Sequence, residues 1–338
     1  MRILIVCSSS GGHVYPGFKF GQYLDRCGEE VRYLGIRGEI EERILPKESL
    51  ILTDLPKSFS RAVKAPKKTL DSAKKIRDIL PSFDAVVGFG GFITFFVAHL
   101  PEMRRIPLYL HEANLDIGDS NRYSLHRARA IFTSFPATEF PRCKKKVCFA
   151  GNPVSDDVTD RKDHPEYIAF VFGSLGSRTL LDRSVRYLSS QNGEELYLLI
   201  TSPKYYEETK NKLKHKKNVT VAPHMEKQEL YRNTRLIFCR GGASTLSEVI
   251  KSGTNCVCIP SPYVKHHHQE RNARYLAIHH ALTVVEEKNY DEKTIREMIE
   301  RYRTPYAAME RAAQKSFITP YPCVKMYMKI KYDLDQKE

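Results

Sequence analysis

The amino-acid sequence predicts an α/β protein made of two doubly wound domains. Short, continuously apolar runs alternate with segments in which apolar residues recur at helical spacing. This alternation is typical of parallel sheets that are covered by helices on both faces. The pattern pauses in a polar, charged stretch from 151 to 165 and then starts again. The 338 residues therefore suffice for two domains of ordinary size, each opening with a strand and a loop of small residues.

The first half supplies four predicted strands. The first of them runs into the serine–glycine stretch CSSSGGHVYPG, and the segment after the strand places Val14, Phe18, Gly21 and Leu24 on one face at helical spacing. The third runs into Gly88-Phe89-Gly90-Gly91, and the fourth into His111-Glu112-Ala113-Asn114. The strands are predicted at 2–7, 30–34, 84–87 and 108–110.

The second half repeats the arrangement. Its first predicted strand runs into Gly173-Ser174-Leu175-Gly176, and its third into Arg240-Gly241-Gly242. We expect a first domain over 1–152 and a second over 153–315, and we expect a basic amphipathic helix, from about 316 to 338, to pack back on the first domain. The strands of this half are predicted at 167–172, 197–200, 236–239 and 256–259.

The loops of small residues predict a ligand site. Parallel strands place these loops at the carboxyl edge of each sheet, so two such domains facing one another would gather them around one central cleft. Glycine turns before helices expose backbone amides to anions. None of the loops is GxGxxG or GxxxxGK[ST]. Together they favour a nucleotide or a nucleotide-sugar as ligand.

The stretch RGGASTLSE at 240–248 is the most informative of these loops. Two glycines end a strand, Ser244 or Thr245 is expected to cap the next helix, and the amides there suit a diphosphate. Glu248 lies about one turn further along and is placed to accept hydrogen bonds from a ribose diol. An acid that only favours its own helix dipole is the alternative.

The histidines offer chemistry of two kinds. His13 is a candidate general base, because imidazole titrates near neutral pH, or it is only a hydrogen-bonding loop residue. Three consecutive histidines at 266–268 cannot all face one ion on regular structure, so we predict no metal site. Contacts between this loop and sugar hydroxyls fit better.

The net charge of +14 indicates an anionic partner. The basic side chains concentrate in the segment 56–81, with eight Lys or Arg against two acidic residues and with Phe59, Val63, Leu70, Ile76 and Ile79 interleaved. The mixture suits an anionic membrane surface, and a solvated helix face is the alternative. No nucleic-acid-binding motif is present. The longest apolar stretch, 89–100, is far below the roughly 20 residues of a membrane-spanning helix.

These motifs together resemble the MurG family of peptidoglycan glycosyltransferases. The resemblance covers nearly the whole chain, and the motifs come in the order of the family. They are SGGHVYP (10–16), VGFGGF (87–92), LHEAN (110–114) with Gly118 and Asn121, GNPV (151–154), FGSLGSR (172–178), RGGASTLSE (240–248), and PSPY (260–263) with His268, Gln269, Asn272 and Ala273.

The resemblance implies a two-domain glycosyltransferase fold of the GT-B type. It implies that N-acetylglucosamine moves from UDP-N-acetylglucosamine to the muramoyl 4-hydroxyl of membrane-bound lipid I, with inversion at the anomeric carbon, to form lipid II. No metal or other cofactor is implied. The place of action would be the cytoplasmic face of a bacterial plasma membrane, in cell-wall synthesis for growth, shape and division, with other cell-wall synthesis proteins as candidate partners.

The resemblance also implies roles for single residues. In the second domain, Glu248 would hold the ribose, Ser244 and Thr245 would face the diphosphate through their amides, and His268 and Gln269 would contact the sugar. In the first domain, His13 would be the base for the acceptor hydroxyl or would position the acceptor diphosphate, with Asn114 near the reaction centre. Ser10, Gly11, Gly12, Ser174, Arg178, Met225, Gly242 and Ala243 complete the predicted substrate-binding set.

The sequence departs from the family pattern at three places. The first loop has three serines where the family has a glycine pair and Thr, which restricts the backbone of a phosphate-facing loop. Ser155 stands where the family has Arg, so a phosphate contact is missing or comes from elsewhere, with Arg178 as the candidate. Gly241 replaces the usual Ser or Ala.

Three other functions compete with transfer to lipid I. A glycosyltransferase with another glycolipid acceptor would share the donor site. A UDP-N-acetylglucosamine 2-epimerase would share the fold, but it needs acidic catalytic residues that the sequence does not obviously provide. A non-catalytic nucleotide-sugar-binding or scaffold subunit would explain the altered first loop.

Overall fold

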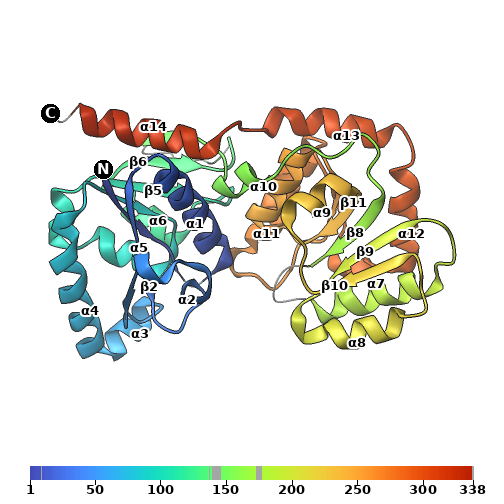
Figure 1. Cartoon of the computed structure of the whole chain (residues 1–338), viewed down its shortest axis with the longest axis horizontal. Helices are drawn as coiled ribbons and strands as arrows, with labels where there is room; N and C mark the ends of the chain where they lie inside the picture. The colour runs from blue at the N-terminus through green and yellow to red at the C-terminus, as the bar shows by residue number, and fades with distance from the viewer. Residues whose placement is uncertain (9, 137, 139–145, 173–176, 337–338) are drawn as a thin grey trace. The chain divides into compact units, whose positions relative to one another are not determined.

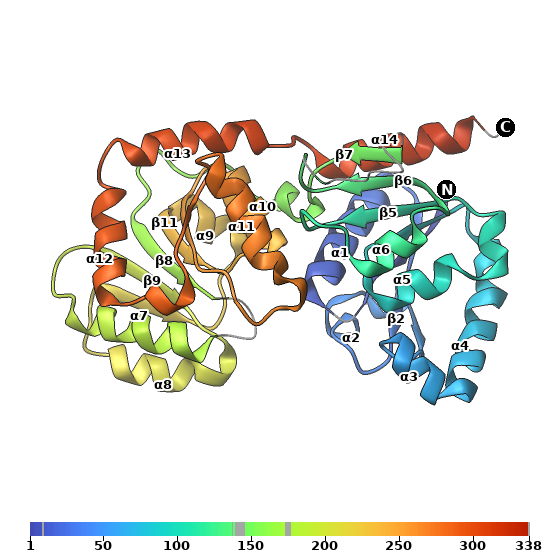
Figure 2. The same cartoon turned by 180° about the vertical axis from the view of Figure 1, so that it is seen from behind.

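The computed structural model describes residues 1–8, 10–136, 138, 146–172 and 177–336. The chain forms two compact units. Unit 1 comprises Met1–Asp156 and Thr319–Glu338, and unit 2 comprises Asp157–Ile318. The sequence-based boundaries were 152/153 and 315/316. Figures 1 and 2 show the helices and strands of each unit from two opposite sides.

Unit 1 is built on a parallel sheet with the strand order β3-β2-β1-β4-β5-β6-β7. The strands are β1 (Arg2–Val6), β2 (Glu30–Ile36), β3 (Leu50–Thr53), β4 (Ala85–Gly88), β5 (Leu108–Glu112), β6 (Ala128–Thr133) and β7 (Val147–Phe149). The α-helices are α1 (Gly11–Arg26), α2 (Glu41–Ile44), α3 (Phe59–Lys64), α4 (Pro66–Ile79), α5 (Gly91–Ala98), α6 (Asp119–Ser124) and α14 (Pro322–Asp335).

Unit 2 repeats this topology with the order β10-β9-β8-β11-β12-β13, again parallel throughout. Both sheets thus follow the order third-second-first-fourth-fifth-sixth, and the predicted class of two doubly wound α/β domains is confirmed. The strands are β8 (Tyr167–Val171), β9 (Leu196–Ile200), β10 (Val219–Ala222), β11 (Thr234–Cys239), β12 (Asn255–Cys258) and β13 (Thr283–Val284). The α-helices are α7 (Arg178–Ser190), α8 (Pro203–Leu213), α9 (Lys227–Asn233), α10 (Ala243–Ser252), α11 (His268–Ile278), α12 (Glu292–Arg301) and α13 (Tyr306–Gln314).

Strand β1 shows why the apolar runs form central strands. Successive side chains of a strand point to opposite faces of the sheet. Ile3 and Ile5 enter the core cluster beneath α1 and α14, whereas Leu4 and Val6 enter the cluster on the other face. All four are fully buried. A strand with two covered faces must be apolar at every position, as the sequence pattern indicated.

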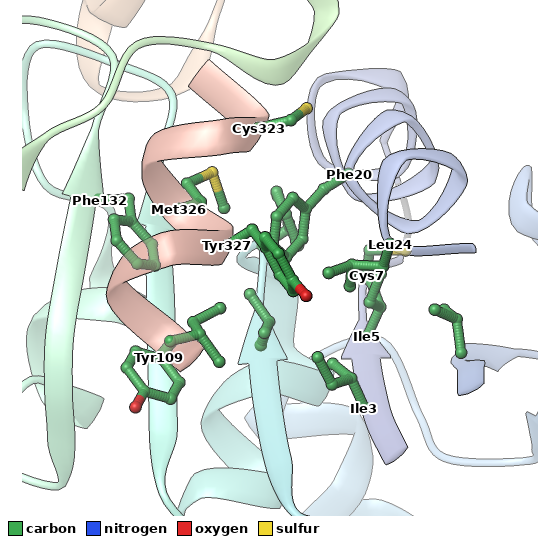
Figure 3. Close-up of a cluster of buried hydrophobic side chains, with 14 of the residues drawn as sticks. Ile3, Ile5, Cys7, Phe20, Leu24, Tyr109, Phe132, Cys323, Met326 and Tyr327 are labelled. Atoms are coloured by element: carbon green, nitrogen blue, oxygen red, sulfur yellow. The ribbon is translucent and has the colours of Figure 1, made fainter. Parts of the chain in front are cut away.

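The carboxyl-terminal helix α14 covers one face of the unit 1 sheet (Figure 3). Cys323, Met326, Tyr327 and Ile330 follow the spacing of one helical face, and all four are buried in the cluster that contains Phe20 of α1. The chain thus returns from unit 2 to complete the core of unit 1.

Five strands of the structure were not predicted from the sequence: β3, β6, β7, β10 and β13. Four of them are short or only partly buried, so their apolar signal is weak; β13 has two residues. Strand β6 is buried but carries Arg129, an exposed charge that interrupts its apolar run. No helix in the described part of the chain is long and apolar enough to cross a membrane.

Candidate functional site

The first loop of unit 1 ends at the amino terminus of α1. Ser10 is the N-cap residue with extended backbone, and its side chain makes no capping bond. Its carbonyl accepts from the amides of His13 and Val14 at 3.1 and 3.0 Å, so the amides of Gly11 and Gly12 lie ahead of the helix's own bonds. The first turn carries no acidic residue. This helix end therefore suits an anionic group.

His13 packs onto the glycine loop that follows β4. Its Nδ1 lies 3.2 Å from the carbonyl oxygen of Ser8. A carbonyl only accepts, so Nδ1 carries the proton in this contact and Nε2 is the basic nitrogen. Gly90 and Gly91 have φ angles of 101° and 78°, and a Cβ on Gly90 would lie 2.9 Å from His13 Nε2. Glycine at 90 thus provides both the left-handed backbone and the room for the imidazole.

A second histidine, His111, lies near His13, and its environment favours the neutral imidazole. It is buried, and its Nε2–H donates to the carbonyl of Gly151 at 3.2 Å. Burial, with a smaller contribution from His13, lowers the pKa of His111 to about 4. The ring is therefore neutral at physiological pH and serves as a structural support.

The HEAN segment at the end of β5 is organised by Glu112, the last residue of the strand, which sequence reasoning did not single out. The buried carboxylate accepts hydrogen bonds from the Asn114 amide at 3.0 Å, from Gly118 at 2.9 Å and from Asn121 Nδ2 at 2.9 Å. The Asn114 side chain also donates to Glu112, at 3.4 Å. The loop of Asn114 is therefore held by a charge-assisted network.

One further bond joins this segment to the glycine loop. Ser120 at the start of α6 donates to the carbonyl of Gly91 at 2.6 Å. His13 in the first turn of α1, Gly90 after β4 and Asn114 after β5 thus lie at the carboxyl ends of three neighbouring strands, beside the switch point between β1 and β4.

The corresponding loop of unit 2 leads from β11 into α10. Gly242 is the N-cap residue, and its carbonyl accepts from the Leu246 amide at 2.9 Å. The expectation that Ser244 or Thr245 caps the helix is wrong, because both residues already lie inside its first turn. Ala243, Ser244 and Thr245 thus present first-turn amides, and the turn carries no acidic residue.

Gly241 departs from the family pattern for a steric reason. A Cβ at this position would lie 2.4 Å from the backbone oxygen of Gln269, at the start of α11. The Gln269 side chain accepts from the Ser261 amide at 3.0 Å, and Asn272 lies 3.5 Å from the Gly241 carbonyl. The structure therefore brings the predicted residue Gln269 against the loop that opens α10, with His268 as the preceding residue of α11.

Glu248 lies on α10 with both carboxylate oxygens engaged. Oε1 forms an ion pair with Lys227, and Oε2 accepts from the hydroxyl of Tyr231 at 2.9 Å. Burial raises the pKa of Glu248, while Lys227 and Tyr231 counteract that rise. Lys227 and Tyr231 belong to α9, which follows the predicted residue Met225. Sequence reasoning missed both, because nothing in the local sequence links α9 to α10.

Arg240 and Arg178 both form hydrogen bonds and ion pairs with other residues of unit 2. Arg240 donates to Ile259 O at 3.1 Å and to Ser177 Oγ at 2.8 Å, and it pairs with Glu287 at 2.7 Å. It thus joins the ends of several strands. Arg178 forms a bidentate pair with Glu208, at 2.7 Å for both bonds, and contacts Asp182 at 2.9 Å. Its predicted phosphate contact would compete with two carboxylates.

Ser155 is buried, and its hydroxyl donates to the carbonyl of Asn152 at 2.8 Å. No side chain at 155 therefore reaches out of this loop toward a phosphate. The predicted donor-site residue Ser174 lies outside the described residues.

The histidine run forms a turn. His266 and His267 have φ angles of 58° and 49°, and His268 begins α11. Among the described residues, no group of three or more His, Cys, Asp or Glu side chains is arranged to hold a metal ion.

Comparisons with known proteins agree with this geometry. Residues 3–133 match the glycosyltransferase family 28 N-terminal domain, and residues 167–321 match the family 28 C-terminal domain. A relative from Bacillus pumilus is 30% identical over 315 residues, covering 85% of this chain and 86% of the relative. One from Bacillus subtilis is 28% identical over 357 residues, covering 97% and 98%. Both are called UDP-N-acetylglucosamine--N-acetylmuramyl-(pentapeptide) pyrophosphoryl-undecaprenol N-acetylglucosamine transferase.

Solved structures show the same fold. MurG of Acinetobacter baumannii superposes with a TM-score of 0.81 at 23% identity, covering 98% of this chain and 99% of that one. The spinosyn rhamnosyltransferase SpnG gives 0.69 at 14% identity, covering 98% and 100%. The GT-B fold that the resemblance implied is confirmed.

Proposed function

The chain belongs to the MurG family of glycosyltransferases, and from this premise we propose that it moves N-acetylglucosamine from UDP-N-acetylglucosamine to the muramoyl 4-hydroxyl of lipid I. The single observation that carries the donor half of the proposal is the first turn of α10. Its amides lie ahead of the helix's own hydrogen bonds, no acid opposes an anion there, and Glu248 lies one turn further along. That combination suits a nucleoside diphosphate.

In this proposal, unit 2 holds the donor. The amides of Ala243, Ser244 and Thr245 would bind the diphosphate, and the positive end of the α10 dipole would stabilise the charge that develops on UDP as it leaves. Glu248 would accept hydrogen bonds from the ribose. His268 and Gln269, whose helix starts against Gly241, would contact the N-acetylglucosamine hydroxyls.

Unit 1 would supply the acceptor chemistry. Nε2 of His13 would take the proton of the 4-hydroxyl while that oxygen attacks the anomeric carbon opposite the departing UDP, which inverts the configuration. The contact between Nδ1 and Ser8 supports this role, because it makes Nε2 the basic nitrogen. The loop of Asn114, held by Glu112, would position the acceptor.

We propose that helices α3 and α4 bind the cytoplasmic face of an anionic membrane, where lipid I would be found. Phe59, Val63 and Leu70 are 67%, 64% and 68% exposed, whereas Ile76 is part of the core and does not belong to this face. Basic residues are interleaved with these three along the sequence. The exposed basic residues of α3 and α4 are Arg61, Lys64, Lys67, Lys68, Lys74, Lys75 and Arg77.

A transfer assay tests the reaction. The protein is incubated with labelled UDP-N-acetylglucosamine in EDTA, with and without a lipid I analogue. We expect label in the lipid product only when the acceptor is present. A new UDP-sugar without acceptor would identify an epimerase, binding without turnover would identify a scaffold, and transfer only to other glycolipids would reassign the acceptor.

Vesicle co-sedimentation tests the membrane face. Leu70→Asp should reduce binding to vesicles that contain anionic phospholipid by roughly tenfold. The variant replaces an apolar side chain that would enter the membrane by a carboxylate, which the negatively charged lipid surface repels. Met309→Asp is the matched control, since Met309 is 66% exposed but lies on α13 of unit 2. Equal losses in both variants would contradict the assignment.

A further inference from the structure

The proposed ribose ligand Glu248 is part of a buried charged trio. Its carboxylate is only 6% exposed and contacts Lys227 through Oε1 and Tyr231 through Oε2. Tyr231 is buried, so the Oε2 contact belongs to the core. Lys227, at 37% side-chain exposure, stands at the solvent side of the trio.

We infer that Lys227 is a positioning residue of the donor site, which keeps the Glu248 carboxylate ionised and oriented for the ribose diol of the nucleotide-sugar. The inference rests on the proposed role of Glu248. Lys227 and Tyr231 each use only part of the acceptor capacity of the carboxylate, because two ionised oxygens offer about four lone-pair sites. Each oxygen therefore retains an acceptor site for one ribose hydroxyl.

The charge state of Glu248 depends on few neighbours. Burial makes the largest contribution and raises the pKa of Glu248, and the charge of Asp157 raises it further. Lys227 and the hydroxyl of Tyr231 lower it. Lys227 is the only cation among these groups. Without it, the buried carboxylate of Glu248 would have no cation to offset its burial and the charge of the exposed Asp157, and Glu248 would take up a proton.

Protonation would change what Glu248 can recognise. A ribose diol offers two hydroxyl donors to a carboxylate, and a protonated carboxyl loses one charged acceptor oxygen and gains a donor. Hydrogen bonds to a charged group are stronger than neutral ones. Lys227 therefore sets donor affinity through Glu248 and requires no contact with the nucleotide itself.

A matched trio elsewhere in the chain separates this role from a purely structural one. In unit 1, Asp333 pairs with Lys329 at 2.8 Å and accepts from Tyr109 at 3.3 Å. The side-chain exposures, 40% for Lys329 and 8% for Asp333, resemble those of Lys227 and Glu248. Asp333 lies in the last turn of α14, whereas Glu248 lies one turn behind the open amino end of α10. Only the second trio has an anion-binding helix end beside it.

The test measures UDP-N-acetylglucosamine binding by titration calorimetry between pH 6.0 and 8.5. Lys227→Met should weaken binding about tenfold at pH 6.5, as expected for lost charge-assisted hydrogen bonds, and the loss should shrink as the pH rises and Glu248 ionises. Lys227→Arg should restore most of the affinity, and Lys329→Met should bind like the unmodified protein. A loss that is equal at every pH, or no loss in Lys227→Met, overturns the inference.

A second pair of variants separates this inference from the proposed function. Glu248→Gln should weaken donor binding about 10- to 100-fold, and adding Lys227→Met to it should cause no further loss. Unchanged binding in Glu248→Gln would refute the ribose role itself. A further loss in the double variant would mean that Lys227 contacts the nucleotide directly and would overturn the positioning role.

Discussion

Both units carry two adjacent glycines in the loop after the corresponding strand, β4 in unit 1 and β11 in unit 2. The two pairs are required for different structural reasons. Gly90 and Gly91 adopt left-handed backbone, and the imidazole of His13 packs on Gly90. Gly242 has a φ of −68°, and Gly241 is needed because the backbone of Gln269 packs on it. The glycine pair of unit 1 is needed because its backbone has positive φ angles, whereas Gly241 of unit 2 is needed because there is no room for a Cβ.

This difference would allow one topology to serve the two proposed chemical roles. In unit 1, a titratable side chain from α1 already lies at the switch point, which suits a proton transfer. In unit 2, the start of α11 packs on Gly241, and the first-turn amides of α10 are the proposed anion site.

The largest effect is expected at His13. His13→Ala should lower kcat by a factor of about 100 or more, because it would remove the proposed general base for the acceptor hydroxyl. Donor binding should remain, since the proposed donor-binding groups lie in unit 2. Steady-state kinetics with calorimetric donor titration check both points, and His164→Ala, an exposed histidine of unit 2, is the control. Near-normal turnover would leave His13 as a structural partner of the glycine loop.

The next effect is expected at Gly241. Gly241→Ala would place a Cβ 2.4 Å from the Gln269 oxygen, so α11 must shift. Overpacking of this kind costs about 1–3 kcal/mol of unfolding free energy, and UDP-N-acetylglucosamine should bind more weakly because His268 and Gln269 move. Gly193→Ala is the matched control, since a Cβ there meets nothing within 4 Å. Denaturant unfolding with equal midpoints for the two variants would contradict the steric account.

The sequence was sufficient for features that follow from local chemistry. Apolar runs and small-residue loops predicted both doubly wound sheets and the place of Glu248, because strand–loop–helix order fixes which residues reach the carboxyl edge. His13, expected in a loop, lies in the first turn of α1. Partners in space were not predictable. Lys227 is 21 positions from Glu248, and Glu208 is 30 positions from Arg178. Only the packing of α9 on α10, and of α7 on α8, makes these pairs.

A smaller effect concerns stability against pH in unit 1. The pKa of His111 is about 4 in the folded chain against an ordinary 6.5, so the unfolded chain binds more protons between these values. The stabilising contribution is complete above pH 6.5 and is lost as the pH falls toward 4. Between pH 7.5 and 5 the loss should approach about 2 kcal/mol. Denaturant unfolding of the unmodified chain and of His111→Asn checks this, and an unchanged acid limb in the variant would exclude His111 as its cause.

Unit 2 contains the opposite case. Burial raises the pKa of Glu310 to about 7 from 4.5, so here the folded chain binds the extra proton. Its contribution is complete below pH 4.5 and is lost as the pH rises through 7. Glu310→Gln should therefore flatten the neutral limb of the stability curve, whereas His111→Asn flattens the acid limb. Identical curves for the two variants would break this contrast between the units.

The smallest effect is expected at Ser244. Its hydroxyl is buried without a hydrogen-bond partner among the described residues, so Ser244→Ala removes no protein contact and should change stability by less than about 0.5 kcal/mol. If α10 binds the diphosphate through its backbone amides, donor affinity should change less than about twofold, because alanine keeps the amide. A loss of tenfold or more in calorimetric titration would show that the hydroxyl itself binds the donor. In that case unit 2, like unit 1, would place a side chain at its switch point.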